Sequence, residues 1–217
     1  MNNGIDHVFR QYDIRGVVGA QLDSDFVYRL GRSIGTYCLD RGARTLSLGR
    51  DARLSSPGFR DAMAQGLLEC GCDVIDIGMV PTPLLYFSLF SLPVDGGVMI
   101  TGSHNPKDQN GFKVCVGKST IYGDEIQRIK EIWKSGTYAA GSGVLSQRDI
   151  SEEYIDHVAS QISKWNRDVR VVVDAGNGVG GVVGVPLYRK LGFDVVELFC
   201  TPDGNFPNHH PDPTVVE

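Results

Sequence analysis

The sequence predicts an α/β protein whose first domain is a three-layer α/β/α sandwich with a mixed, mainly parallel sheet. Two observations predict this class. Short apolar runs of strand length alternate with longer stretches in which apolar residues recur at spacings of three and four. Such alternation is typical of layered α/β folds. It runs over about residues 6–136 and resumes at about 148, so we expect a second, similar domain over 148–217 that has too few strands and helices to close a core.

The elements of the first domain follow from this pattern in chain order. Phe9 to Gly16 reads as a strand that leads into a turn, and a helix is predicted next, with Ser24 as its N-cap. Its buried stripe consists of Val27, Leu30, Ile34, Tyr37 and Cys38. The further elements are a strand over Thr45–Leu48, a helix opened by Ser56-Pro57 and stopped by Gly71, a strand over Asp73–Ile77, a helical stretch over Leu84–Leu92, strands over Val98–Ile100 and Phe112–Val116, and a helix marked by Ile126, Ile129 and Trp133.

Small residues without periodicity over Gly136–Gly143 indicate a linker, which we expect to cover residues 137–147. After it the sequence predicts a helix over Ser151–Lys164, a strand over Val169–Val173, a glycine loop over Ala175–Gly181, another helical stretch, a strand over Phe193–Leu198 and a proline-rich loop over Cys200–Glu217.

Composition excludes several classes of protein. A net charge of -5 gives no electrostatic reason to expect nucleic-acid binding, which usually requires a clustered basic surplus. No apolar run approaches the roughly 20 residues of a membrane span, and the N-terminus lacks the apolar core of a signal peptide. The five cysteines are an odd number and four adjoin apolar runs, which favours free thiols in a reducing compartment such as the cytoplasm.

The most informative stretch is Val98–Val114, in which an apolar run breaks into a polar loop and then resumes. Ser103 stands at the centre of that loop, where strands on either side fix the backbone while the hydroxyl stays accessible. Phosphoryl transfer requires an oxygen acceptor, converging donors and a cation to offset the phosphate charge. Ser103, His104, Lys113 and Arg15 supply those chemical types. An Arg beside a turn glycine is also a common solvated surface charge, and the stretch could be a long polar turn.

Two other kinds of site compete with this interpretation. Gly176, Gly178 and Gly181 match the G-x-G-x-x-G pattern of dinucleotide-binding proteins after a strand, and Glu197 lies where a ribose-binding acid would. Gly184 and Pro186 weaken the helix that should hold the pyrophosphate. A serine hydrolase is disfavoured because adjacent residues on extended backbone, such as Ser103 and His104, point in opposite directions.

Several motifs in this order resemble those of the α-D-phosphohexomutase family, and within it the bacterial phosphomannomutase/phosphoglucomutase branch. They are YDIRG at Tyr12–Gly16, GRD at Gly49–Asp51, VPTP at Val80–Pro83, TGSHNP at Thr101–Pro106, NGFK at Asn110–Lys113, VVVDAGNG at Val171–Gly178 and DGNFPNHHPDP at Asp203–Pro213. The resemblance covers nearly the whole chain and implies phosphohexomutase domain 1 followed by part of domain 2.

The resemblance implies a mutase that interconverts hexose 1-phosphate and 6-phosphate of mannose or glucose. Ser103 would carry the phosphoryl group and pass it to the sugar through a hexose 1,6-bisphosphate. Lys113 matches the family's proton-transfer lysine, which would need a pKa lowered by burial or by a neighbouring cation such as Arg15. Arg15 matches an arginine that steadies the transferred group, and Tyr12 matches a substrate-contacting tyrosine.

The sequence departs from the family in one respect. Family members continue into an Asp-Gly-Asp-x-Asp-Arg loop, whose carboxylates bind Mg²⁺ together with the phosphoserine, and into two further domains; we find none of these motifs here. We therefore expect an N-terminal fragment, inactive alone, with Ser103 as its contribution to the Mg²⁺ site through its phosphate. A full-length protein is expected to be monomeric, whereas this chain could self-associate. A non-catalytic phosphosugar-binding module is the third alternative.

Overall fold

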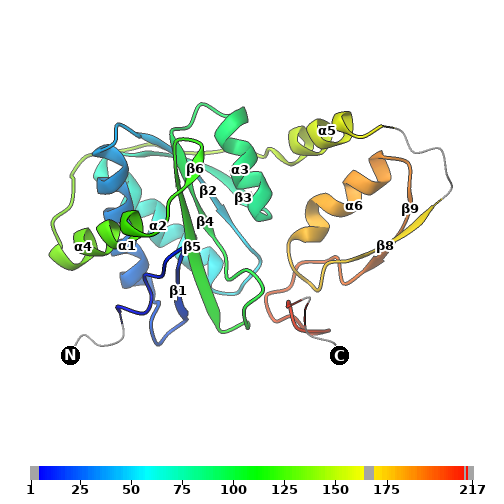
Figure 1. Cartoon of the computed structure of the whole chain (residues 1–217), viewed down its shortest axis with the longest axis horizontal. Coiled ribbons are helices and arrows are strands. Elements are labelled where there is room, and N and C mark those ends of the chain that lie inside the picture. Colours follow the sequence, from blue (N-terminus) through cyan, green and yellow to red (C-terminus); the bar gives the residue numbers. More distant parts are fainter. Residues whose placement is uncertain (1–4, 164–168, 213, 215–217) are drawn as a thin grey trace.

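The computed structural model describes residues 5–163, 169–212 and 214. Figure 1 shows a larger unit that holds the N-terminal two thirds of the chain and a smaller unit beside it. Lys164, the predicted end of one helix, and Pro213 and Val215–Glu217 of the predicted C-terminal loop lie outside the described residues.

The larger unit is built on one seven-stranded sheet with strand order β1-β5-β4-β2-β3-β7, and β6 pairs with β5. The strands are β1 (Ile14–Val17), β2 (Thr45–Arg50), β3 (Asp73–Met79), β4 (Gly96–Ile100), β5 (Gln109–Val116), β6 (Ser119–Thr120) and β7 (Leu145–Gln147). β2 is parallel to β3 and β4, and β3 is parallel to β7, whereas β5 is antiparallel to β1 and β4. The prediction of a mixed, mainly parallel sheet is confirmed.

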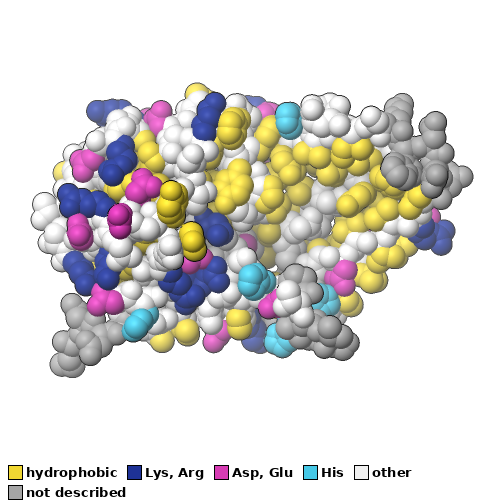
Figure 2. Space-filling view, viewed as in Figure 1, with side chains coloured by type: hydrophobic (Ala, Val, Ile, Leu, Met, Phe, Trp, Pro, Cys, Tyr) yellow, Lys and Arg dark blue, Asp and Glu magenta, His cyan; other side chains and the backbone are white. Residues whose placement is uncertain are grey.

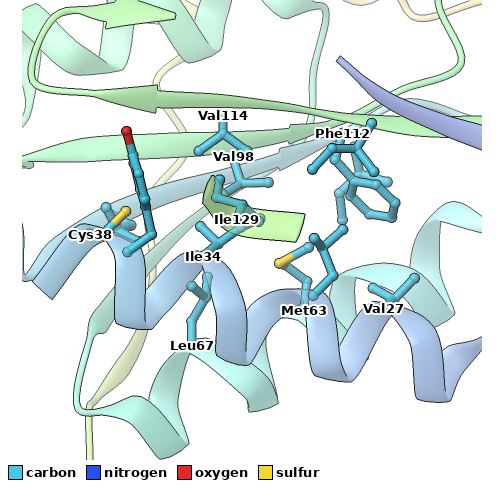
Figure 3. Packing of buried hydrophobic residues seen from close by; sticks show 14 of the residues in the cluster. Val27, Ile34, Cys38, Met63, Leu67, Val98, Phe112, Val114 and Ile129 are labelled. Carbon is cyan, nitrogen blue, oxygen red and sulfur yellow. The ribbon is translucent and has the colours of Figure 1, made fainter. Parts of the chain in front are cut away.

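Helices cover both faces of this sheet. They are α1 (Ser24–Leu39), α2 (Ser56–Cys70), α3 (Thr82–Ser91) and α4 (Asp124–Ser135). The apolar faces of α1, α2 and α4 pack on one side of the sheet, where Ile34, Met63 and Ile129 meet Val98, Phe112 and Val114 (Figure 3). On the other side α3 packs Leu84, Leu85 and Leu89 against Met99 and Cys115. The three-layer arrangement is therefore confirmed.

The structure corrects two predicted boundaries near the N-terminus. The N-cap of α1 is Asp23, whose side chain accepts a hydrogen bond from the Phe26 N–H at 2.8 Å, so the prediction of Ser24 as the cap is wrong. The first strand begins at Ile14, because Phe9 makes only an isolated bridge with Ile14 across a turn. Gly71 ends α2 in the left-handed conformation with φ 97°, as the sequence predicts.

The predicted linker contains an element of the first sheet. Residues 145–147 form β7, which adds to β3 in parallel register. The segment before it lies against the helices: the Ala139 N–H donates to Thr36 Oγ1 at 2.9 Å, and Arg32 donates to the Ala139 carbonyl at 3.0 Å. Residues 145–147 of the predicted linker over 137–147 therefore belong to the first sheet. The sequence does not reveal this strand, because an edge strand can be short and exposed and then carries no apolar pattern.

The smaller unit contains α5 (Ser151–Gln161), β8 (Arg170–Asp174), α6 (Gly180–Lys190) and β9 (Asp194–Leu198). β8 and β9 form a parallel pair, and α6 packs on one face of it. Ile155 of α5 and Val183 of α6 join the same buried cluster as Leu84 and Met99 of the larger unit. The two units therefore share an apolar contact beside α3.

Candidate active site

The Ser103 loop, residues 101–108, connects the carboxyl end of β4 to β5. Ser103 is exposed and has the left-handed backbone conformation with φ 55°, which is uncommon for a residue other than glycine. Its N–H donates to Thr101 Oγ1 at 2.9 Å. The expectation that this serine lies on a solvent-accessible loop at one end of the sheet is confirmed.

The left-handed turn also changes the relation between Ser103 and His104. Ser103 Oγ lies 3.4 Å from His104 Nδ1, which is a long contact for a hydrogen bond. Side chains of adjacent residues point in opposite directions only on extended backbone. The backbone at Ser103 is not extended, since its φ is 55°, so the imidazole and the hydroxyl stand next to each other.

Arg15 lies on β1 and reaches the same loop. Its Nη1 donates to Asn105 Oδ1 at 2.7 Å, and its Nη2 donates to Asp13 Oδ2 at 2.5 Å. Its Nε is buried and has no partner among the described residues. A buried unpartnered donor costs about 1–3 kcal/mol, and such groups are found at sites where a ligand completes the hydrogen bonding.

Lys113 and Tyr12 flank this arginine. In the register of β1 and β5, Arg15 pairs with Gly111, so Lys113, two residues further along β5, points to the same face of the sheet. Within the described part of the chain the structure shows no hydrogen bond or ion pair of the Lys113 ammonium, and it places no contact between Lys113 and Ser103. Tyr12 lies in the turn before β1 with 66% of its surface exposed.

Beneath the Ser103 loop lies a buried polar network that the sequence analysis did not predict. Its centre is the ion pair between Arg53 Nε and Asp51 Oδ2 at 3.1 Å, and the Arg53 side chain is 1% exposed. The Gly102 N–H donates to Asp51 at 3.1 Å, and the Ser56 hydroxyl donates to it at 2.5 Å. The available signal was the charged run Arg50–Arg53 at the carboxyl end of the buried strand β2, since charges at the carboxyl end of a parallel strand often serve a site.

The second unit faces Ser103 across a cavity of about 240 Å³. The lining residues are Asp51, Ala52, Thr101 and Ser103 from the first unit and Asp174, Ala175, Gly176, Gly178, Val179, Phe206, His209, His210 and Pro211 from the second. His209 Nε2 lies 3.0 Å from Asp174 Oδ1. The Gly176 N–H and then His209 hold the pKa of the Asp174 carboxyl below its usual range. A ligand on Ser103 would meet both units here.

The glycine loop considered as a dinucleotide site forms part of this cavity wall. Its following helix contains Pro186, and Glu197 forms an ion pair with Arg189 at 2.5 Å, so that carboxylate has a protein partner. No group of three or more His, Cys, Asp or Glu side chains suited to a metal ion is found among the described residues. These residues therefore do not by themselves fit a Mg²⁺ site made of carboxylates.

Comparison with known proteins decides the family. Residues 6–140 match the family model described as phosphoglucomutase/phosphomannomutase alpha/beta/alpha domain I, and residues 152–217 match domain II of the same description. The chain belongs to the phosphoglucomutase/phosphomannomutase family. The resemblance inferred from the TGSHNP and NGFK motifs is confirmed.

Named members of the phosphoglucomutase/phosphomannomutase family are close in sequence. The chain is 47% identical over 206 residues to a phosphomannomutase/phosphoglucomutase of Pseudomonas aeruginosa, covering 95% of this chain and 44% of that protein. It is 45% identical over 212 residues to a phosphoglucomutase of Neisseria gonorrhoeae, covering 97% of this chain and 46% of that protein. The chain thus spans somewhat less than half the length of these relatives.

Solved structures agree with this assignment. A phosphoglucomutase/phosphomannomutase family protein from Burkholderia thailandensis superposes with a TM-score of 0.92 at 43% identity, covering 96% of this chain and 47% of that chain. A protein from Thermus thermophilus described as a phosphomannomutase superposes with a TM-score of 0.86 at 26% identity, covering 98% of this chain and half of that chain.

None of the described helices is long and apolar enough to cross a membrane.

Proposed function

We propose that the protein acts as a phosphohexose mutase that interconverts the 1- and 6-phosphates of mannose, glucose or both, and that this chain supplies the phosphate-carrying serine, Ser103. Its substrates are hexose phosphates and a hexose 1,6-bisphosphate. The family assignment and the names of the relatives support this reaction class. The dinucleotide-binding alternative has no support from these relatives or from the partnered Glu197 carboxylate.

The observation that carries the proposal is the presentation of the Ser103 hydroxyl. The side chain is exposed on a loop that is fixed from below by Asp51 and Arg53, and it opens into the cavity between the units. Arg15 is anchored on the same loop through Asn105. A permanently charged fork beside an accessible hydroxyl suits a phosphoryl group, which arginine binds through parallel N–H donors.

The reaction consists of two phosphoryl transfers. In the first, the bond between the phosphorus and Ser103 Oγ breaks while a sugar hydroxyl oxygen forms the new bond, which gives the bisphosphate and a free serine. The bisphosphate turns over, and Ser103 Oγ then attacks its other phosphorus and releases the isomeric monophosphate. Arg15 balances charge on the transferred group.

We assign the remaining residues by their types and positions. In each transfer Lys113 takes the proton from the attacking hydroxyl and delivers it to the oxygen that leaves phosphorus, which is Ser103 Oγ in the first transfer and the sugar oxygen in the second. Lys113 lies on the same sheet face as Arg15. His104 lies 3.4 Å from the Ser103 hydroxyl and can donate a hydrogen bond to a phosphate there. Tyr12, which is exposed in the turn before β1, contacts the sugar.

Mg²⁺ is part of the proposal through the phosphate on Ser103. When bound, the ion offsets charge on the phosphoryl oxygens. The described residues offer no carboxylate cluster for it, so Ser103 is the only ligand that we assign to this chain. We also propose a cytoplasmic location, because the cysteines Cys38, Cys70, Cys72, Cys115 and Cys200 are all unpaired.

The test is Ser103→Ala in the full-length protein, with Ser160→Ala as the control because Ser160 is exposed on α5, outside the site. We expect Ser103→Ala to abolish conversion of glucose 1-phosphate and mannose 1-phosphate, while Ser160→Ala keeps it. Mass spectrometry after incubation with a hexose bisphosphate should locate one phosphate on Ser103. A turnover rate unchanged by Ser103→Ala would reject the assignment, and binding of NADH would favour the dinucleotide alternative. Sugar binding that survives without any turnover in the unmodified protein would identify a non-catalytic module.

A further inference from the structure

The guanidinium of Arg53 has a partner for every one of its donors, and three of these partners are carbonyls of the loop that carries Ser103. Its Nη2 donates to the carbonyls of Ser103 at 3.0 Å and Asn105 at 2.6 Å. Its Nη1 donates to the carbonyls of Pro106 at 2.6 Å and Gln109 at 2.9 Å. The remaining N–H, on Nε, pairs with Asp51. An arginine has five N–H donors, so this side chain is completely satisfied.

These hydrogen bonds stabilise a loop whose backbone is strained at Ser103. Ser103 has φ 55°, and a non-glycine residue in that region costs about 1 kcal/mol or more. The contacts of Arg53 converge on the carbonyl of Ser103 itself and on three carbonyls that follow it, so they fix the direction in which the chain leaves this residue. A buried charge is stable only when it is paired and hydrogen-bonded, and the Asp51 carboxylate supplies the negative charge that compensates the Arg53 guanidinium.

Gly102 shows how closely the arginine approaches. A Cβ built on Gly102 would lie 2.3 Å from Arg53 Nε and 2.4 Å from its Cζ. Only glycine leaves room for the guanidinium under the loop. The TGS sequence is therefore explained by the space that Arg53 occupies, in addition to any role of the serine.

The second unit also contacts Arg53. The ring of Phe206 lies over the guanidinium with 5.4 Å between Arg53 Cζ and the ring centroid, within the range of a cation–π contact. In the same turn, a Cβ on Gly204 would lie 2.5 Å from the Ala52 carbonyl and 2.7 Å from the Leu54 nitrogen. The turn is anchored in its own unit, because the Asp203 N–H donates to the Asn177 carbonyl at 2.8 Å.

We propose that Arg53 is a positioning residue that holds the Ser103 loop in its left-handed conformation and couples this loop to the Asp203–Phe206 turn of the second unit. Its effect on phosphoryl transfer rests on the function proposed above, whereas its effect on the loop does not. Contact with this turn would stabilise the position of the Arg53 guanidinium and therefore the conformation of the Ser103 loop. Movement of the second unit away from Arg53 would remove that stabilisation.

The first test is amide hydrogen exchange of the chain with Arg53→Lys. Lysine keeps the charge but offers three donors, so it cannot pair with Asp51 and hold four carbonyls at once. We expect exchange of the peptide covering residues 101–110 to become about tenfold faster or more, with the peptides of α1 and β2 unchanged. Arg60→Lys is the matched control, because Arg60 forms an ion pair of 2.5 Å with Asp76 and makes no such contact with the described residues of the loop. Unchanged exchange in the loop, or equal acceleration in every peptide, would overturn the role of Arg53.

The second test addresses the coupling with Gly204→Ala, which forces the turn away from the backbone of Ala52 and Leu54 while Arg53 stays intact. Gly180→Ala is its control, because a Cβ there meets nothing within 4 Å. Faster exchange of residues 101–110 in Gly204→Ala alone supports the coupling, and loop exchange equal to that of the unmodified chain contradicts it. This variant also decides the matter if Arg53→Lys does not fold.

A kinetic measurement separates positioning from general support of the fold. In the full-length protein, we expect Arg53→Lys to lower the maximal rate of Ser103 phosphorylation by a hexose bisphosphate about tenfold to a hundredfold with little change in the half-saturating concentration. A raised half-saturating concentration at an unchanged maximal rate would contradict a positioning role. If the unmodified protein is not phosphorylated, the proposed function fails, while the exchange experiment still judges Arg53.

Discussion

Individual residues at the site show where sequence reasoning succeeds. Ser103 could be identified because a polar loop stands out between apolar runs, and Arg15 because of its charge and the YDIRG motif. In the structure Arg15 lies on β1 and contacts the serine's loop through Asn105. The relation between Ser103 and His104 could not be read from spacing, since it depends on φ 55° at one residue. Arg53 was missed because a buried arginine looks like a surface charge in a sequence, and only its five partners reveal its role.

Arg15 should not be replaceable by lysine. One guanidinium contacts Asp13 and Asn105 through different nitrogens, whereas a lysine has a single nitrogen and cannot hold both while facing a phosphate. We expect Arg15→Lys to slow phosphorylation of Ser103 by about a hundredfold, the usual effect of removing one donor to a transferred group. Quantitative mass spectrometry over time gives the rate. Arg10→Lys, an exposed arginine of the same segment, should be neutral, and equal rates for both variants would contradict the role of Arg15.

The cysteines should differ sharply in reactivity. Burial raises the pKa of Cys72 to about 12 and also raises the pKa of the Cys38 and Cys115 thiols. At pH 8 a thiol with such a pKa is ionised about three orders of magnitude less than an ordinary one, and the thiolate is the reactive form. Partial burial also raises the pKa of the Cys200 thiol, but Cys200 is the one cysteine that is not buried, so a thiol reagent can reach it and should label it first. Cys200→Ser should remove that fast phase, and rapid labelling of several cysteines in the native chain would disprove this order.

At the scale of elements, long amphipathic helices were predictable and short edges were not. The apolar stripes of α1, α2 and α4 coincide with the buried cluster in Figure 3, because a period of three to four residues is imposed by packing on a sheet. β7 has three exposed residues, and its pairing with β3 consists of the parallel backbone register and one long contact from Ser146 Oγ to the Val74 carbonyl at 3.4 Å. A pattern of side chains contains no record of such a strand.

The contact between α1 and α2 depends on a glycine. A Cβ on Gly66 would lie 2.4 Å from the Tyr28 carbonyl and 2.8 Å from the Arg32 nitrogen, both backbone atoms of α1. The helices must separate to accept it, so we expect Gly66→Ala to lower the free energy of unfolding by about 1–3 kcal/mol. Gly58→Ala in the same helix meets nothing within 4 Å and should be neutral or stabilising by up to about 1 kcal/mol. Urea unfolding followed by circular dichroism compares the two variants. Equal midpoints would show that α1 moves away from the added methyl group without loss of stability.

At the scale of the whole molecule, the two units differ in how much core they possess. In the first unit, helices cover both faces of a seven-stranded sheet. In the described part of the second unit, the sheet consists only of β8 and β9. α6 covers one face of that pair, and hydrophobic side chains gather at the surface over this part of the molecule (Figure 2). The site between the units thus joins a rigid serine loop to a partner of lower stability, since a two-stranded sheet is marginal alone.

One face of β8 and β9 is covered by no helix or strand of the described residues, and it predicts self-association of this chain. Val172 and Val196 are paired in register, point to the same face, and are 59% and 40% exposed. An apolar face beside open strand edges favours pairing with another copy.

We expect the weight-average mass in sedimentation equilibrium to rise with protein concentration over the micromolar range. The double variant Val172→Thr/Val196→Thr should reduce that rise, because threonine keeps the β-propensity and removes apolar surface. Val144→Thr is the control, since Val144 is 68% exposed in the segment before β7, away from this face. A constant monomer mass for the unmodified chain would refute the prediction, and equal effects of the double variant and the control would locate the contact elsewhere.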